Sequence, residues 1–357
     1  MTVDADVMLV GSVPLSGPDE VMRECGSGLG DLVVAIPDGE TGDRTLWVTY
    51  QAYRVFHEHP QLETLQRPAP VDGQEQWIPK SLDDVWTFGI NEGAGELRFD
   101  DLKYASVAEA SYGIFRKLRD EGVIAPGVRF QVSLPLAESA VAWFFHDPEL
   151  IAHVLPAYEE ALVRELGRIN VAIPAEDLSL QWDVCWEVLD QEGVFPWSIT
   201  EPAPIERFRE TIGRLSPHVP EDVLLGYHLC YADLNHKHMK EPVDLRLCVE
   251  MANIAATNSG RRVDYFHMPV PRDRDDDAYF EPLSRLNVGD AKVFLGLVHH
   301  TDGVDGTRRR VATARRHLDR FGIATECGFG RRPPEHVSAL LEIHRTVAGD
   351  LAGLPAT

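Results

Sequence analysis

Side chains that can bind a metal ion lie in this chain where hydrophobic runs end. His228 and Cys230 close one run, His267 ends another, and Cys327 follows a third. Thiolates combined with imidazole are ligands that favour zinc over magnesium or calcium. Because His228 and Cys230 are two residues apart, their side chains point to the same face of an extended strand. The pattern predicts a zinc site built from these four residues.

The elements that must position these side chains are eight short runs rich in Val, Leu, Ile and Phe, several of them continuously apolar, as in strands buried on both faces. The runs cover residues 7–14, 32–36, 128–134, 178–182, 223–227, 263–266, 292–298 and 322–325. Amphipathic helical patterns lie between most runs, including 148–170, 244–258 and 307–321. This alternation predicts a (β/α)8 TIM barrel, in which the strand ends meet at one mouth. A doubly wound open sheet is the alternative.

Residues 41–126 are too many for a strand-to-helix connection, which takes a few residues. We expect a long helical insertion after the second strand, ending in a helix over 103–121. An insertion at this end of a strand caps the barrel mouth, so it is predicted to act as a lid or substrate wall. A purely stabilising role is the alternative. On this interpretation, residues 1–357 form a single barrel domain.

Composition and charge restrict the partners of this protein. The 357 residues have a formal net charge of −23, which argues against binding to nucleic acid or anionic membranes. No apolar stretch reaches the roughly 18 residues of a membrane span, and no export signal is recognisable. Five cysteines, an odd number, do not indicate a disulfide framework, and Cys185 and Cys248 are interpreted as small core residues. We expect a cytoplasmic protein with free thiols. The oligomeric state is left open, and a homo-oligomer is compatible with the sequence.

Several motifs resemble cobalamin-independent methionine synthase and its relatives among the uroporphyrinogen decarboxylase-like barrels. His228-Leu-Cys230 and Cys327-Gly328 are similar to the zinc motif of that family. Three further segments resemble its motifs on the first, second and fourth strands: 10–14 (VGSVP), 38–43 (DGETGD) and 181–183 (QWD). The resemblance spans almost the whole chain but only the catalytic half of the full-length enzyme.

The resemblance also implies how a substrate is held. Gly11 and Ser12 would bind the carboxylate of an amino acid. Glu40 and Asp183 would bind its ammonium group, and Asp43 lies in the same motif as Glu40. A thiol of the homocysteine type satisfies these contacts. We therefore predict these five residues as the substrate-binding set.

The chain departs from the family at the end of the predicted sixth strand, where the family has a glutamate ligand. His267 occupies that place, and Glu250 is the alternative ligand. Two histidines and two cysteines carry less negative charge than one histidine, one glutamate and two cysteines, so the zinc would be the stronger Lewis acid. A closed structural zinc site is the alternative.

A second departure follows the predicted seventh strand, where the family has an aspartate and then a histidine or lysine. This chain has His299, His300 and Asp302 there. Imidazoles titrate near neutral pH, so we predict these three residues as the catalytic acids and bases.

The leading hypothesis is a zinc-dependent thiol alkyltransferase, most simply a methyltransferase to homocysteine or a similar amino-acid thiol. Its donor could be a folate, a corrinoid or another alkyl compound. A close alternative is the opening of an epoxide by a thiol such as coenzyme M, whose sulfonate would want basic residues. A metal-free, uroporphyrinogen-type decarboxylase would use Arg44, Arg331 and Arg332. A non-catalytic zinc-binding barrel also remains open.

Overall fold

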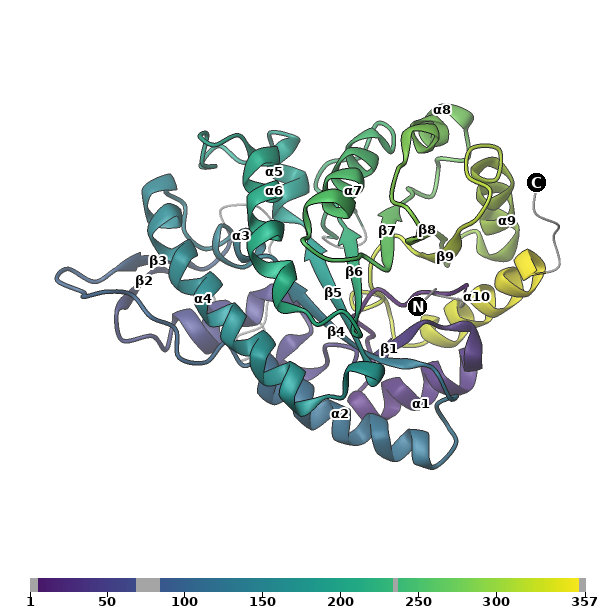
Figure 1. Cartoon of the computed structure of the whole chain (residues 1–357), viewed down its shortest axis with the longest axis horizontal. Coiled ribbons are helices and arrows are strands. Elements are labelled where there is room, and N and C mark those ends of the chain that lie inside the picture. The colour runs from purple at the N-terminus through teal and green to yellow at the C-terminus, as the bar shows by residue number, and fades with distance from the viewer. Residues whose placement is uncertain (1–5, 69–83, 234–236, 353–357) are drawn as a thin grey trace.

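A curled parallel sheet of seven strands lies at the centre of the computed structural model, which describes residues 6–68, 84–233 and 237–352 (Figure 1). Its strands follow one another in chain order around the sheet, each parallel to the next. They are β1 (Ala35–Pro37), β4 (Arg129–Pro135), β5 (Leu178–Val184), β6 (Leu224–Leu229), β7 (Tyr265–Pro269), β8 (Lys292–Val298) and β9 (Gly322–Thr325). Seven of the eight predicted runs are thus confirmed as strands. Every residue of β5 and of β6 is buried, which explains their continuous apolar character.

The first predicted run is not a regular strand. Val7 forms isolated parallel bridges to Val33 beside β1 and to Ile323 in β9, so this segment lies between the two edges of the sheet. The ladder is interrupted at Val10, whose carbonyl oxygen accepts hydrogen bonds from the side-chain amides of Gln131 and Gln181, at 2.8 and 2.7 Å. It resumes at Ser12, which forms a parallel bridge to Gly39 after β1. Within the described residues, the curled sheet therefore has seven regular strands, with three isolated bridges in the segment where the remaining strand of the barrel was predicted.

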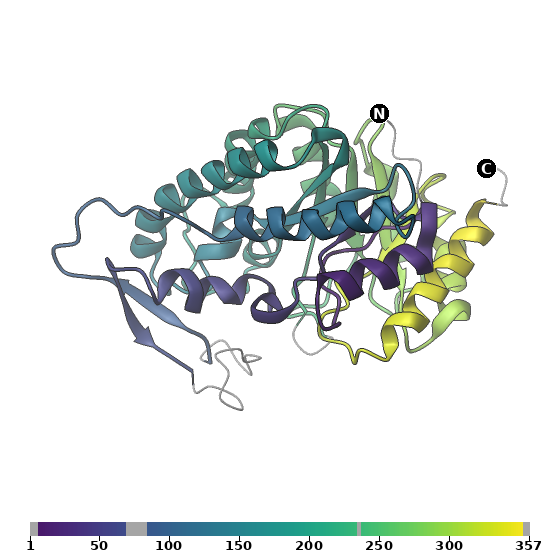
Figure 2. The ribbon, with the colours of Figure 1, turned by 90° about the horizontal axis from the view of Figure 1, so that it is seen from below.

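Helices cover the outside of the sheet (Figures 1 and 2). The helices predicted at 103–121, 148–170 and 244–258 are confirmed within about two residues at each end, whereas the one predicted at 307–321 begins at Gly303 and already ends at Ala314. They are α1 (Pro18–Leu29), α2 (Tyr104–Asp120), α3 (Ala137–Val141), α4 (Pro148–Ala172), α5 (Trp186–Gln191), α6 (Pro204–Leu215), α7 (Arg246–Asn258), α8 (Asp277–Phe280), α9 (Gly303–Ala314) and α10 (His336–Ala352). Within the described ranges, none of the helices is both long and apolar enough to pass through a bilayer.

Helix α4 illustrates how the sequence sets these elements. The side chain of Asp147 accepts hydrogen bonds from the first-turn N–H groups of Glu149 and Leu150, and Pro148 occupies the first helical position. Its buried face repeats at helical spacing through Ile151, Val154, Tyr158, Ala161, Leu162, Leu166 and Ile169.

We predicted a helical insertion for residues 41–126, and this was wrong in part, because the described part of the segment is not purely helical. It contains short helical turns and α2, but also an antiparallel pair of strands, β2 (Leu62–Gln66) and β3 (Thr87–Ile90). This pair lies at the end of the molecule opposite α10 (Figure 2). Aromatic packing explains the pair, since Phe88 of β3 and Phe56 beside it contact each other inside a buried cluster. Residues 69–83 lie outside the described residues.

Candidate metal and substrate site

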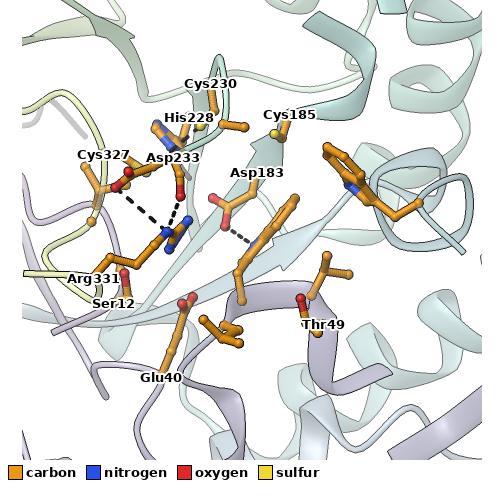
Figure 3. Close-up of a pocket in the computed structure, with 18 of the residues that line it drawn as sticks. Ser12, Glu40, Thr49, Asp183, Cys185, His228, Cys230, Asp233, Cys327 and Arg331 are labelled. Atoms are coloured by element: carbon orange, nitrogen blue, oxygen red, sulfur yellow. Dashed lines mark hydrogen bonds and ion pairs between the residues drawn. The ribbon is translucent and has the colours of Figure 1, made fainter. Parts of the chain in front are cut away.

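The ends of β6 and β9 bring one imidazole and two thiols together. His228 lies in β6, Cys230 follows that strand, and Cys327 follows β9. Their ligand atoms all lie within 4.8 Å of one another, and the two sulfur atoms are 4.0 Å apart. Two thiolates that share a tetrahedral zinc ion at about 2.3 Å lie about 3.8 Å apart. The types and spacing of these donor atoms therefore fit zinc (Figure 3).

His267, the fourth predicted ligand, is not part of this group. It lies in β7 beside His228, and the Nδ1 atoms of the two rings are 2.7 Å apart. Its other nitrogen, Nε2, is 2.9 Å from the carbonyl oxygen of Thr325. Both ring nitrogens of His267 thus have protein partners, so neither is available to a metal ion in this arrangement. The alternative ligand, Glu250, is exposed on α7.

Burial and close contact change the acidity of the three grouped side chains. The pKa of the Cys230 thiol is raised well above its ordinary value, chiefly by a hydrogen bond with Cys185. The pKa of Cys327 is raised by its hydrogen bond with Cys230 and by burial. Burial and the neighbouring His267 hold the pKa of His228 well below its ordinary value. The imidazole is therefore neutral, as a metal ligand must be, whereas the thiols would lose their protons to a bound cation.

Two buried carboxyl groups point into the same pocket (Figure 3). Asp183, in β5, accepts hydrogen bonds from Gln181 Nε2 at 2.8 Å and from Trp47 Nε1 at 3.0 Å. Glu40 lies after β1, and burial raises its pKa to about 7. Burial, together with the charge of Glu40, raises the pKa of Asp183 well above its ordinary value. A positively charged ligand between the two acids would favour their ionised forms, so the pair suits an ammonium group.

The loop after β9 packs against Ser12, on the other side of the pocket. The Gly330 N–H group donates a hydrogen bond to Ser12 Oγ at 3.2 Å. Gly328 has no room for a side chain, since a Cβ atom there would lie 2.2 Å from Ser12 Oγ. The same loop brings Arg331 into the pocket, where its guanidinium group donates a hydrogen bond to the backbone oxygen of Asp233. A cationic group thus faces the two acids across the pocket.

Four of the five predicted substrate-binding residues, Gly11, Ser12, Glu40 and Asp183, line this pocket. The fifth, Asp43, does not: its side chain is exposed and pairs with Arg54.

The three predicted catalytic residues also lie outside the pocket lining. His300 stacks on His336, with ring centroids 3.7 Å apart. His299 Nε2 donates a hydrogen bond to the Val270 carbonyl oxygen at 2.8 Å, and burial lowers the pKa of this imidazole to about 3.

Asp302 accepts two hydrogen bonds from the buried guanidinium group of Arg310, at 2.7 and 2.9 Å. This ion pair gives Asp302 a structural function. Catalytic roles for His299, His300 and Asp302 stay predictions that this geometry does not support.

The pocket contains side chains to which the sequence analysis gave no role in the proposed chemistry. Cys185 lines the pocket and directly follows β5. Its position at a strand end, the signal that identified Cys327, could therefore have identified it as well. Arg331 is close in sequence to Cys327, and its place beside the zinc motif was the available signal. Trp47, which holds Asp183, had no such signal, because its partner is remote in sequence.

No protein-family model matches the chain, and none of the curated proteins is similar enough in sequence to match it. Solved structures do match. A B12-independent methionine synthase from Shewanella sp. W3-18-1, in complex with selenomethionine, aligns with a TM-score of 0.60 at 15% identity, covering 98% of this chain and 99% of that one.

Two further solved structures match over similar lengths. A Listeria monocytogenes protein assigned as a vitamin-B12 independent methionine synthase has a TM-score of 0.58 at 12% identity, covering 99% of this chain and 98% of that one. A methyltransferase from Methanosarcina mazei has a TM-score of 0.52 at 13% identity, covering 95% and 94%. These matches confirm the predicted resemblance at the level of the fold: the chain is built like B12-independent methionine synthases and a methanogen methyltransferase.

Proposed function

We propose that this protein is a zinc-dependent enzyme that transfers a methyl or other alkyl group to a thiol, most simply to homocysteine or a similar amino-acid thiol. One observation carries the proposal: the His228, Cys230 and Cys327 group opens on the same pocket as the Glu40 and Asp183 pair. A thiol and an ammonium group of one small molecule can reach the two at once.

His228, Cys230 and Cys327 would hold the zinc ion, and bound zinc would supply the Lewis acidity that keeps a substrate thiol deprotonated at neutral pH. Zinc in catalytic sites takes three protein ligands and leaves a further position for substrate or water. The chain offers such a set of three.

The remaining pocket side chains would orient the substrate. Glu40 and Asp183 would bind its ammonium group, with Asp183 held in place by Trp47. Ser12 and Arg331 would bind its acid group on the opposite wall. An amino-acid thiol has all three groups, and its sulfur would then face the zinc ligands.

The rest of the chain would form the frame for this pocket. We infer that the sheet closes as a (β/α)8 barrel, with the segment around Val7 as its eighth strand, since Val7 bridges both edges. The segment 41–126 would act as a cap. The pocket-lining side chains that support this role are Leu46, Trp47, Val48, Thr49 and Val85.

Arg331 favours a second candidate substrate, a thiol with a sulfonate group such as coenzyme M, because it supplies a cation in the pocket. The paired acids oppose that substrate. The decarboxylase hypothesis has less support, since the charge of Arg44 is taken by Asp38, with which it forms an ion pair.

The first test is the zinc content of the purified protein and of the Cys230→Ala and Cys327→Ala variants, measured by mass spectrometry. We expect about one zinc ion per chain, lost in both variants. Cys25→Ala, which removes a buried thiol of α1 outside the pocket, is the matched control and should retain the metal.

The second test is zinc-edge X-ray absorption with homocysteine, with a thiol acid lacking the amino group, and with coenzyme M. A new sulfur neighbour of zinc with homocysteine supports the proposal. The same gain with coenzyme M but not with homocysteine would favour the second candidate. If none of the three thiols adds a sulfur neighbour to zinc, the result would contradict thiol activation.

A further inference from the structure

We propose that His267 is a positioning residue and not a zinc ligand: it fixes the tautomer of His228 through a hydrogen-bond chain and leaves zinc with three protein ligands. The inference rests on the proposed function for the identity of the metal. It goes further by specifying that a substrate thiol adds to an open position, with no protein ligand to displace.

The partners of His267 assign the protons in this chain. A carbonyl oxygen only accepts, so Nε2 of His267 must donate its proton to Thr325. Nδ1 of a neutral His267 is then an acceptor, and the facing Nδ1 of His228, 2.7 Å away, must donate. Nε2 of His228 therefore carries no proton, and its lone pair is available to a metal ion.

The opposite arrangement would disable the site. A doubly protonated His267 would donate from Nδ1 to His228, which would force the remaining proton of a neutral His228 onto Nε2, the atom needed by the metal. Burial opposes that charged state, since His267 is 0% exposed and His228 3% exposed. Within the described part of the chain, neither ring forms a hydrogen bond or an ion pair with a carboxylate that could stabilise the charge.

The same series of hydrogen bonds also connects the two strands that precede or carry the zinc ligands. Thr325 accepts from His267 through its carbonyl oxygen, and its hydroxyl group donates to the carbonyl oxygen of Cys327 at 2.6 Å. His267 thus reaches from β7, next to the strand of His228, to the end of β9, next to Cys327. One buried side chain supports both the imidazole and the second thiol of the site.

This arrangement changes the charge of the metal centre. A zinc ion with two thiolates and a neutral imidazole has no net charge, whereas the glutamate that the resemblance would put at position 267 would make the centre negative. A thiolate adds more favourably to a neutral centre. In this protein His267 therefore stands in place of a charged zinc ligand and forms a hydrogen bond to the ligand His228 instead. The loss of such a hydrogen bond to a ligand typically lowers metal affinity by about 10–100-fold.

The first experiment tests the tautomers without metal. Nitrogen-15 NMR of the histidine-labelled, zinc-free protein should find His228 protonated on Nδ1 and His267 protonated on Nε2, with signals assigned by His228→Gln and His267→Gln. Protonation of His228 on Nε2 would overturn the proposal, whatever reaction the protein catalyses.

The second experiment compares zinc affinities, by chelator competition, of the full-length wild type, His267→Gln and His267→Leu. Glutamine can accept from His228 and donate to Thr325, so we expect nearly wild-type affinity; leucine can do neither, and we expect a loss of about 10–100-fold. Equal losses in both variants would contradict positioning. Circular dichroism identifies misfolding of the leucine variant, and the glutamine variant then decides.

X-ray absorption separates this inference from the proposed function. Thiol-free wild type and Cys185→Ala should both show one imidazole and two sulfur neighbours of zinc. Two imidazoles would make His267 a ligand, and a third sulfur that disappears in Cys185→Ala would close the open position; either result overturns the proposal. Failure of added thiol to bind, with the tautomers as expected, would instead count against the proposed function alone.

Discussion

Ionisation of the buried Glu40 carboxyl group should lower the free energy of unfolding of this protein, although the ionised form is the one that would bind the substrate ammonium group. Burial raises the pKa of the Glu40 carboxyl group from 4.5 to about 7. The folded state thus holds this proton more tightly than the unfolded state, and stability falls as pH rises from 4.5 through 7. At 1.36 kcal/mol per pH unit, the loss above pH 7 is about 3 kcal/mol. Glu40→Gln, which is neutral throughout, should recover that free energy of unfolding at pH 8 and change little at pH 4.5.

Urea denaturation at pH 4.5 and pH 8, at equal zinc loading, measures this difference. The exposed Glu109 of α2 provides the matched control, and Glu109→Gln should show no comparable gain. A Glu40→Gln variant that is no more stable than wild type at pH 8 would refute the reasoning.

The same variant should bind an amino-acid thiol more weakly, because the ammonium group loses an anionic partner. With a pKa of about 7, Glu40 is ionised in about a tenth of wild-type molecules at pH 6 and about nine tenths at pH 8. Wild-type affinity for the ammonium group should therefore rise about tenfold over this range. A thiol that lacks the amino group is the control ligand. Its affinity over the same pH range corrects for ionisation of the sulfur, and that affinity should be the same in wild type and in Glu40→Gln.

Three further outcomes are expected. Asp302→Asn should lower the free energy of unfolding, measured by urea denaturation, by about 2 kcal/mol. This is less than for a fully buried ion pair, because the carboxylate is 22% exposed. A loss of turnover without a loss of stability would instead support its predicted catalytic role. Arg331→Gln should weaken binding of acid-bearing thiols by about 10–100-fold in calorimetry and leave zinc content unchanged. Removal of zinc by a chelator should lower the melting temperature and abolish alkyl transfer, both restored by added zinc; transfer that persists without metal would contradict the proposed chemistry.

The strands could be predicted because their information is local. Runs such as β5 are apolar on both faces, and this continuous apolar pattern is enough to predict a buried parallel strand. The convergence of His228, Cys230 and Cys327 followed from the same reasoning, since parallel strands place their ends together. Local pattern failed at Val10, whose carbonyl oxygen is satisfied by the side chains of Gln131 and Gln181.

The finer parts of the site depend on partners that spacing does not reveal. His267 lies at a strand end as predicted, but its ring is held by His228 and the Thr325 carbonyl oxygen. Asp302 likewise follows a strand, yet a buried arginine in α9 takes its carboxylate. In both cases the residue type and the strand end were correct clues to position, and the nearest neighbour decides the role.

The packing of Ser12 on the loop after Cys327 makes the metal and substrate sites mechanically one unit. Gly328 and Gly330 leave no gap against Ser12, so the loop that carries a zinc ligand cannot shift without moving the wall that would hold the acid group of the substrate. Affinities for zinc and for the amino acid are then coupled, and by thermodynamic reciprocity each ligand changes the affinity for the other by the same factor. Loss of zinc would therefore weaken the binding of the amino acid, and bound amino acid would strengthen the binding of zinc by the same factor.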